Sequence, residues 1–258
     1  MSLAQGLLSA ADAGARLDPA TYPLANAAAG QALQDAVSAL RQARGERPLG
    51  WKIGFTNRSI WPLYGVSHPI RGPLWHTTVT QLEGSLAELR PARWAEPRLE
   101  PEIVFGLAAS PERADPDHVL GCIGWVAHGF EVVTSPWAGW RFSAAQAIAA
   151  QGLHGALLIG PRRPCGPADD AALAGLTLHL SCNDAPVATG QGSAVLDGPV
   201  QALAHLVAQA LAEGWRLPAG AIVTTGTLTD AQPLAPGQHW QTRLEGIDLP
   251  GLTLITHG

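Results

Sequence analysis

The chain has a single lysine, and its position is the first pointer to chemistry. Lys52 is the only Lys among sixteen Lys and Arg residues, and it lies in an apolar, glycine-flanked run at residues 49–56. An ammonium group is a compact charge whose pKa moves readily on burial, whereas a guanidinium group stays charged. A site that grips a substrate carboxylate, or exchanges a proton near neutrality, can therefore require lysine. The alternative is a lysine at a strand end whose ammonium group reaches water.

Three glutamates could supply oxygen ligands to a metal. Glu100 and Glu102 flank Pro101, a residue tolerated at a strand start or sheet edge, and residues i and i+2 of a strand share one face. Two carboxylates so close repel each other unless a positive charge lies between them, and a hard divalent cation serves best. Glu131 follows an apolar run at residues 123–130, where a charge is costly without a partner. Together the three acids predict a Mg²⁺ or Mn²⁺ site; the alternative is a solvated acidic pair and an unrelated edge glutamate.

Composition narrows the class of protein. The net charge of −5 over 258 residues gives no basic footprint for nucleic acid. No apolar run reaches the roughly 18 residues of a membrane span, and the start lacks the basic region of a secretory signal. Cys122, Cys165 and Cys182 are widely spaced and odd in number, which predicts free thiols and a cytoplasmic protein.

The elements expected to position these residues form an α+β pattern. Residues 1–47 carry helical spacing, with helices predicted at 2–13 and 25–44, and residues 48–258 read as a β-rich catalytic domain. Strands are predicted at residues 50–56, 103–107, 123–133, 156–159, 176–181, 221–225 and 252–255. Further helices are predicted at 116–120, 142–149 and 199–212, the last with a clear amphipathic face. The sequence therefore predicts a β-rich core with helices packed outside it.

An ordered set of short motifs carries a family resemblance. They are Gly-Trp-Lys-Ile-Gly-Phe-Thr at 50–56, Tyr-Gly-Val-Ser-His-Pro at 64–69, Gly-Pro-Leu at 72–74, Glu-Pro-Glu-Ile-Val-Phe at 100–105, His-Gly-Phe-Glu-Val-Val at 128–133, Leu-His-Gly-Ala-Leu-Leu-Ile-Gly at 153–160, Gly-Ser-Ala-Val-Leu-Asp-Gly-Pro at 192–199, Thr-Thr-Gly-Thr at 224–227 and Pro-Gly at 236–237. In this order they resemble the fumarylacetoacetate hydrolase superfamily, and within it the 2-oxopent-4-enoate hydratase/4-oxalocrotonate decarboxylase branch. The resemblance extends from about residue 48 to the C-terminus.

The resemblance implies a mixed β-roll with an N-terminal helical segment and a homo-oligomeric assembly. It implies that Glu100, Glu102 and Glu131 bind Mg²⁺ or Mn²⁺, and that Lys52 is the active-site lysine. Substrate contacts are implied at Lys52, Leu74, Gln151 and Thr227. The substrate would be a small 2-oxo acid, whose negative charge in the reaction a metal stabilises as a Lewis acid.

Several positions depart from the branch pattern. Ile70 stands where hydratases carry an acid, Ala150 and Gln151 replace an Asp-Asn pair, and residues 134–136 read Thr-Ser-Pro instead of Asp-Ser-Arg. The changed residues would handle protons, so His154 is the nearest candidate for acid/base catalysis, because histidine titrates near neutrality. The alternative is a core histidine bonded to backbone. No free His-x-x-Glu dyad follows the lysine run, which favours hydration or decarboxylation over C–C hydrolysis.

Three functions follow from these residues. The first is a metal-dependent hydratase of a 2-oxo-4-enoate, and the second is a decarboxylase of a 2-oxo-3-enedioate. A second substrate carboxylate would require another cation, for which Arg71 and Arg141 are the candidates. The third is a non-catalytic, metal-binding partner subunit, which the altered proton-handling residues suggest.

Overall fold

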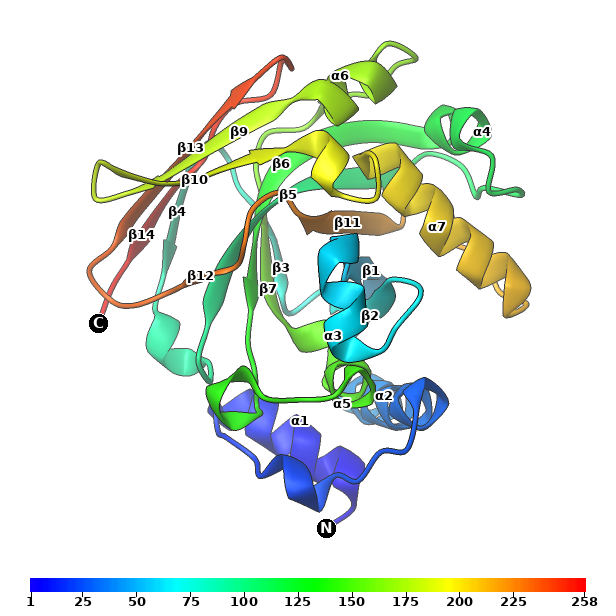
Figure 1. Cartoon of the computed structure of the whole chain (residues 1–258), viewed down its shortest axis with the longest axis vertical. Helices are drawn as coiled ribbons and strands as arrows, with labels where there is room; N and C mark the ends of the chain where they lie inside the picture. The colour runs from blue at the N-terminus through cyan, green and yellow to red at the C-terminus, as the bar shows by residue number, and fades with distance from the viewer.

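Runs of β-branched and apolar residues form two curved sheets in the computed structural model, which describes residues 1–258. The larger sheet has nine strands in the order β2-β1-β11-β5-β6-β7-β3, with β12 added beside β5 and β8 beside β6. Its strands are β1 Pro48–Gly54, β2 Ile70–Trp75, β3 Val79–Gln81, β5 Arg98–Leu107, β6 Ile123–Val133, β7 His154–Ile159, β8 Arg163–Pro164, β11 Ile222–Thr227 and β12 Gln232–Pro233. The long strands β5 and β6 bend across the centre of the molecule (Figure 1).

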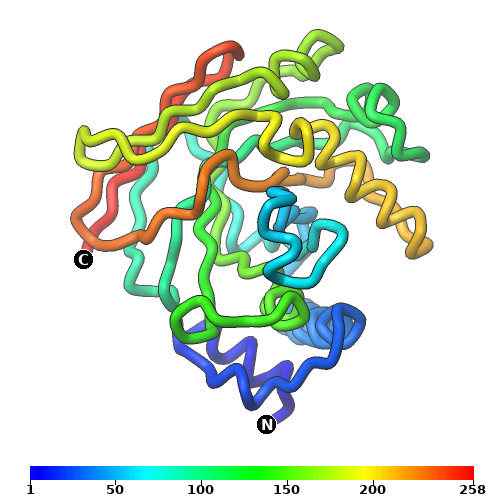
Figure 2. The backbone as a smooth tube through the Cα atoms, viewed as in Figure 1, coloured from blue at the N-terminus to red at the C-terminus, as the bar shows by residue number.

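A second sheet of five strands packs beside the first, in the order β10-β9-β13-β14-β4. Its strands are β4 Leu86–Leu89, β9 Thr177–Cys182, β10 Ala185–Gln191, β13 His239–Glu245 and β14 Thr253–Thr256. The helices are α1 Leu3–Ala13, α2 Ala27–Ala43, α3 Trp61–Tyr64, α4 Pro116–Gly121, α5 Ala144–Ala149, α6 Asp169–Gly175 and α7 Pro199–Ala212. The chain starts beside α1 and ends at the outer side of the smaller sheet, away from its start (Figure 2). None of the helices has the length and apolar character needed to cross a membrane.

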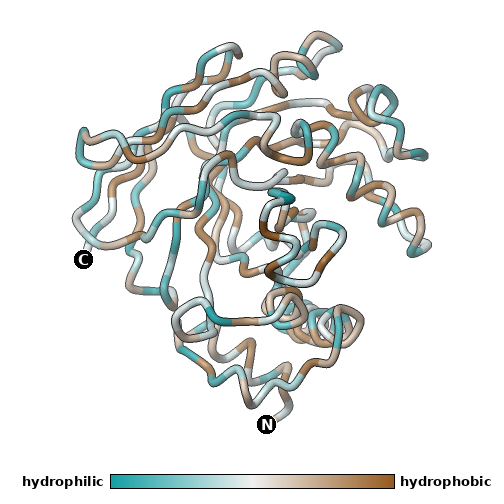
Figure 3. Tube along the Cα trace, in the orientation of Figure 1, coloured by the Kyte–Doolittle hydropathy of each residue, from teal (hydrophilic) through white to brown (hydrophobic).

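The main hydrophobic core joins the two sheets and α7. Phe105 of β5, Leu178 of β9 and Leu203 of α7 are fully buried members of one cluster of 36 residues. Polar and apolar residues alternate along α7 (Figure 3), and its buried face follows the predicted helical spacing. A smaller cluster, which includes Val104, Ala127 and Leu157, covers the opposite face of the larger sheet.

The N-terminal helices pack on the larger sheet through α5. Leu7 of α1, Val37 of α2 and Ile148 of α5 belong to one buried cluster. The side chain of Gln34 donates hydrogen bonds to the backbone oxygens of Ile148, at 2.7 Å, and Arg71, at 2.9 Å. These bonds satisfy carbonyl groups that would otherwise be costly to bury. Figure 1 shows α1, α2 and α5 together at one end of the molecule.

The predicted α+β fold with an N-terminal helical segment is confirmed, while the strand inventory from the sequence was incomplete. The strand at 123–133 and the helix at 199–212 have their predicted bounds. The unpredicted strands are β2, β3, β4, β8, β10, β12 and β13. Of these, β3, β4, β8 and β12 are at most four residues long, and the polar or glycine- and proline-containing sequences of β2, β10 and β13 give weak alternation.

The placement of Pro101 at a strand start or sheet edge was wrong. Strand β5 lies between β11 and β6, and Pro101 pairs with Phe130 in its interior. The backbone oxygen of Pro101 accepts a hydrogen bond from Leu228, so its nitrogen also faces β11. The register of β11 shifts between Thr224 and Thr227. A proline is tolerated in this central strand because the neighbouring ladder is already interrupted.

Candidate active site

The register of two neighbouring strands brings the three glutamates together. Glu100 of β5 lies directly opposite Glu131 of β6, and Glu102 follows on the same face of β5. One carboxylate oxygen from each residue lies within 4.8 Å of the other two. The side chains of Glu102 and Glu131 are completely buried, whereas that of Glu100 is 15% exposed. The cluster therefore opens to solvent on the side of Glu100.

Glu102 is held on one oxygen and unpartnered on the other. Its Oε2 accepts hydrogen bonds from the Thr224 hydroxyl and, at 2.8 Å, from the Gly226 backbone nitrogen. Its Oε1 is buried without a hydrogen-bond partner. Burial raises the pKa of Glu102 well above its usual range, and the charge of Glu131 adds to the rise. A buried carboxylate oxygen aimed into an acidic cluster fits a divalent cation, which would satisfy the oxygen and offset the repulsion.

The same physical causes act on the other two ligand candidates. Burial raises the pKa of Glu100 to about 7, against the opposing charge of Lys52. Burial also acts to raise the pKa of Glu131, but the Lys52 charge and the His154 hydrogen bond outweigh it and lower that pKa. Glu131 is thus the carboxylate that stays ionised, between a cation on one side and a histidine on the other.

A glycine in the left-handed region shapes the strand that supports Glu102. Gly226 has φ +107°, and a Cβ added there would lie 2.1 Å from the Thr56 hydroxyl oxygen. Only glycine fits this conformation and this close approach. The resulting turn of the backbone points the Gly226 N–H at Glu102 and places Thr227 at the cavity wall. The Thr227 hydroxyl donates to the Thr229 backbone oxygen at 2.7 Å.

Lys52 faces the acidic cluster from strand β1. Its Nζ lies 3.1 Å from Glu131 Oε2 and 4.0 Å from Glu100 Oε2, and the residue is only 3% exposed. The predicted alternative of a lysine reaching water is therefore wrong. Burial acts to lower the pKa of Lys52, but the charges of the three glutamates, led by Glu131, overcome it and raise that pKa above its usual range.

A cavity of about 900 Å³ gives access to this cluster. Lys52, Glu100 and Thr227, three of the residues predicted for the site, line it, and Ile70 lies in its wall. Gly152 borders the lysine stem closely, because a Cβ added there would lie 2.9 Å from Lys52 Cδ. The cavity is therefore large enough for a small organic ligand that reaches both the carboxylates and the ammonium group.

The structure places the side chains of Leu74 and Gln151 outside this cavity. Leu74 is fully buried in the apolar cluster with Val104. The Gln151 amide accepts a hydrogen bond from Trp75 Nε1 and donates one to the Gln34 backbone oxygen, both at 3.0 Å. Gln151 thus ties β2 to α2. Any substrate contact of Leu74 or Gln151 would therefore have to come from backbone atoms. Matching residues to a family motif does not distinguish a backbone contact from a side-chain contact.

His154 lies behind Glu131, on the side away from Lys52. Its Nδ1 is 2.7 Å from Glu131 Oε1, and its Nε2 is 2.8 Å from the Thr78 hydroxyl. The predicted alternative, a histidine bonded to backbone, does not describe these partners. Burial lowers the pKa of His154, against the effect of Glu131. His154 borders a separate cavity of about 430 Å³ and does not line the cavity of Lys52 and Glu100. Its contacts are therefore those of a residue that positions Glu131.

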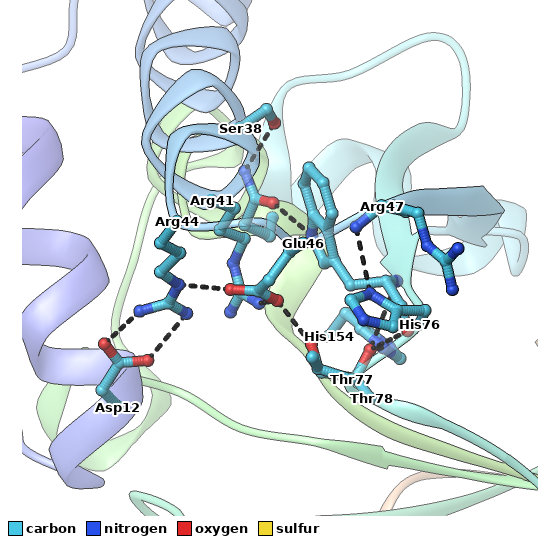
Figure 4. A network of polar contacts seen from close by, with 12 residues as sticks. Asp12, Ser38, Arg41, Arg44, Glu46, Arg47, His76, Thr77, Thr78 and His154 are labelled. Atoms are coloured by element: carbon cyan, nitrogen blue, oxygen red, sulfur yellow. Dashed lines mark hydrogen bonds and ion pairs between the residues drawn. The ribbon is translucent and has the colours of Figure 1, made fainter.

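A polar network continues from His154 towards the N-terminal helices (Figure 4). Glu46 accepts hydrogen bonds from the Thr77 hydroxyl and from Arg44, and its Oε2 lies 2.8 Å from Arg41 Nη1. Arg44 also reaches Asp12 of α1. The network links the strand that carries His154 to α1 and α2, and it gives those helices a polar attachment to the site.

Sequence reasoning missed several cavity residues, among them Arg98, Tyr64, Trp140 and Phe142. Arg98 could have been found, because it lies two residues before Glu100 and so shares the face of the two glutamates. Tyr64 ends helix α3, whereas Trp140 and Phe142 lie in the segment before α5, and no spacing rule joins the two segments. Arg71, one predicted second cation, instead pairs with Glu213 at 2.7 Å. Arg141, the other, is exposed and outside the cavity.

Comparison with known proteins identifies the family. The family model described as fumarylacetoacetate (FAA) hydrolase C-terminal matches residues 66–250. The chain is 31% identical to a 2-hydroxyhexa-2,4-dienoate hydratase of Comamonas testosteroni, over 81% of this chain and 78% of the relative. It is 30% identical to a 4-oxalocrotonate decarboxylase of a Pseudomonas species, over 88% and 85%.

A solved structure shows the same fold over nearly the whole chain. It is the 4-oxalocrotonate decarboxylase from Pseudomonas putida G7 complexed with magnesium and adipate, with a TM-score of 0.89 and 24% identity. The alignment covers 98% of this chain and 95% of that one. Because the family model covers most of the chain and the similarity to curated relatives reaches 31%, this protein belongs to the fumarylacetoacetate hydrolase family.

Proposed function

We propose that the protein is a divalent-metal-dependent lyase of small 2-oxo acids, in the first place a hydratase that adds water to a 2-oxo-4-enoate. The observation that carries the proposal is the convergence of Glu100, Glu102 and Glu131 opposite the buried Lys52. The relatives are named as hydratases and decarboxylases of small 2-oxo acids, or of the enol forms of such acids, in aromatic catabolism. These names support the same class of reaction.

The three glutamates are the proposed ligands of Mg²⁺ or Mn²⁺. A bound cation would supply Lewis-acid stabilisation of the negative charge that develops at the 2-oxo group. Magnesium in the Pseudomonas putida G7 decarboxylase supports this choice of metal. Oxygen-only ligands with one open side also suit a hard cation that keeps positions for substrate and water.

The chain's own groups would bind and orient the substrate. Lys52 keeps its proton beside the glutamates, so it can hold the substrate carboxylate by a charge-assisted hydrogen bond. The Thr227 hydroxyl lies at the same wall and is the proposed second substrate contact. His154 fixes Glu131 from behind by its 2.7 Å contact. Ile70 makes this part of the wall apolar.

The second candidate function is decarboxylation of a 2-oxo-3-enedioate. Arg98 favours it, because this guanidinium group adds a second positive charge to the same cavity. The third candidate, a non-catalytic partner subunit, draws its support from the apolar residue at Ile70 and from the absence of the branch's acid there.

An ultraviolet assay separates the three candidates. Purified protein with Mg²⁺ or Mn²⁺ is expected to bleach 2-hydroxypenta-2,4-dienoate if it is a hydratase. Bleaching of 4-oxalocrotonate with release of CO₂ would instead identify a decarboxylase. If the metal-bound protein bleaches neither substrate, the hydratase and the decarboxylase candidates are both contradicted. The non-catalytic partner subunit is then the remaining candidate.

The assembly and location of the protein belong to the same proposal. We infer a cytoplasmic homo-oligomer, supported by the three free cysteines and by the family resemblance. Native mass spectrometry of the purified protein tests the assembly, and a monomer at micromolar concentration would contradict it.

A further inference from the structure

A second cavity, of about 430 Å³, lies between the N-terminal helices and the strands of the site. His154 forms part of its wall, and none of its lining residues lines the cavity of Lys52. The side chains of Asp12 and Arg44, also in its wall, are 48% and 38% exposed, so this second cavity is open to solvent. It is therefore a separate place at which a small molecule can bind.

The charges that line this second cavity are not balanced. Its wall includes three guanidinium groups, of Arg41, Arg44 and Arg93, and two carboxylates, of Asp12 and Glu46. Both carboxylates are already paired within the wall, because Arg44 pairs with Asp12, and Arg41 and Arg44 share Glu46 (Figure 4). When these five groups are ionised, the wall carries one positive charge in excess.

Two of the three arginines have donor groups to spare. Arg93 stacks on Trp94, with its guanidinium carbon 4.7 Å from the ring centroid, and it takes part in none of the ion pairs of the chain. A stacked guanidinium group keeps its edge N–H groups free for a planar carboxylate. The side chain of Arg41 is only 9% exposed, and its Nε is buried without a hydrogen-bond partner.

The positive charge of Arg41 is only partly compensated. Burial lowers the pKa of Arg41, although the charge of Glu46 acts in the opposite direction. Glu46 also serves Arg44 and the Thr77 hydroxyl, so it has little capacity left for Arg41. An anion held in the second cavity would supply the missing negative charge.

An apolar chamber between α1, α2 and α5 adjoins the second cavity. The chamber has a volume of about 40 Å³ and shares Ala11, Arg41, Thr134 and His154 with the larger cavity. Since one water needs roughly 10–15 Å³ of such volume, the chamber has room for a short hydrocarbon chain. The other side chains of its wall are mainly apolar, among them those of Leu7, Ala10, Val37 and Ala149.

We propose that the second cavity and its chamber bind a small monocarboxylate with a short apolar chain. The carboxylate would lie at Arg93 and Arg41, and the chain would enter the chamber. One negative charge balances the excess positive charge of the wall, and the chain displaces water from apolar surface. Because the wall is formed by α1, α2 and β7, the ligand would hold the N-terminal helices on the larger sheet. The site lies outside the proposed active site and does not depend on the metal.

Butyrate and butyramide test this site in the metal-free protein, because they have nearly the same shape and only butyrate is charged. Isothermal titration calorimetry at constant ionic strength is expected to show at least about tenfold tighter binding of butyrate, the range of a charge-assisted hydrogen bond. Acetate lacks two methylene groups, so it should bind at least about fivefold more weakly than butyrate. Without metal, the acidic cluster of the main cavity repels carboxylates.

Two substitutions locate the bound carboxylate. Arg93→Gln removes the unpaired cation and should bring the ratio of the butyrate and butyramide Kd values close to one. Its control is Arg47→Gln, because Arg47 is exposed and outside the second cavity, and this variant should keep the wild-type ratio. Ala11→Glu places a negative charge between the cavity and its chamber and should also remove the preference. Ala11→Gln has the same size without the charge and should keep the preference.

Equal binding of butyrate and butyramide by the wild-type protein would overturn the site. A preference retained in either Arg93→Gln or Ala11→Glu would overturn it as well, because the carboxylate would then bind elsewhere. Equal binding of acetate and butyrate would contradict the proposed class of ligand, since the chain would not enter the chamber. Ala11 is exposed on α1, so its two variants decide the matter even if Arg93→Gln does not fold.

Discussion

At the scale of single residues, the cluster is a balance of buried charges. Three ionised glutamates and one lysine would leave a net negative charge inside the protein, and burial resists this charge by raising the pKa of both Glu100 and Glu102. A single ammonium group cannot neutralise three carboxylates, and Glu102 Oε1 has no donor at all. This imbalance of charge is the physical reason to expect a divalent cation. It also means that substitutions of a glutamate and of the lysine should have different effects.

Replacing Glu102 with glutamine should weaken metal binding while leaving the fold intact. The amide oxygen can still accept hydrogen bonds from Thr224 and Gly226, but the ligand charge is lost. We expect Mn²⁺ affinity, measured by calorimetry, to fall by at least about tenfold. Glu112→Gln is the control, because Glu112 is a largely exposed acid paired loosely with Arg216. Unchanged Mn²⁺ affinity in Glu102→Gln would contradict a metal role for this residue.

Replacing Lys52 with methionine should destabilise the metal-free protein and abolish turnover. Removing one partner of a buried ion pair leaves Glu131 uncompensated, at a cost of about 3–5 kcal/mol. Mg²⁺ restores positive charge beside the glutamates, so it should raise the Tm of Lys52→Met more than that of the wild-type protein. Thermal unfolding with and without Mg²⁺ measures both effects. Equal Mg²⁺ shifts in the two proteins would argue against charge compensation by Lys52.

At the scale of elements, strand β6 connects the site to the second sheet. Its His128 is 1% exposed, with Nδ1 at 3.0 Å from the Glu102 backbone oxygen and Nε2 at 2.8 Å from the Thr242 hydroxyl of β13. Burial lowers the pKa of His128 to about 4. A neutral histidine therefore bridges the strand of the metal ligands and the smaller sheet.

This bridge predicts a loss of stability in acid. The unfolded chain has an ordinary histidine pKa near 6.5, so below that pH it binds a proton that the folded protein excludes down to about pH 4. The contribution of His128 to the free energy of unfolding is thus complete above pH 6.5. It falls by on the order of 3 kcal/mol as the pH is lowered towards 4.

The variant His128→Gln isolates that effect, since it has no titrating ring and other groups cancel in the difference. Urea unfolding should show that the stability of the wild-type protein relative to His128→Gln falls by about 2–3 kcal/mol between pH 7 and pH 4.5. A difference that does not change with pH would show that His128 is not held neutral in the folded protein.

At the scale of the whole molecule, the N-terminal helices are attached to the site by buried amides. Gln34 of α2 bonds to backbone oxygens of Ile148 and Arg71, and its own backbone oxygen accepts from Gln151. Gln151 is followed by Gly152, which borders Lys52. The helical segment, which we propose is part of one folding unit with residues 48–258, thus supports the wall that holds the lysine.

Removing the Gln34 amide should therefore reduce global stability. Gln34→Leu removes this donor from the Ile148 oxygen, which is buried, and from the Arg71 oxygen, which is partly buried, and a buried oxygen left without a donor costs about 1–3 kcal/mol. Gln42→Leu is the control, because Gln42 is exposed on the same helix. A urea midpoint that falls for Gln34→Leu and not for Gln42→Leu is expected. Equal midpoints would show that the attachment contributes little.

The sequence alone determined the family, the three acids, the single lysine and the principal core elements. These features are local: Glu100 and Glu102 share a face by strand alternation, and the helix at 199–212 follows from its apolar spacing. The tertiary structure decided what depends on contact between distant segments. It placed Glu131 opposite Glu100 by strand register, turned His154 to the far side of Glu131, and used the amide of Gln151 for packing. It also brought Arg98 over the ring of Trp140, because strand and loop positions meet only after the sheet curls.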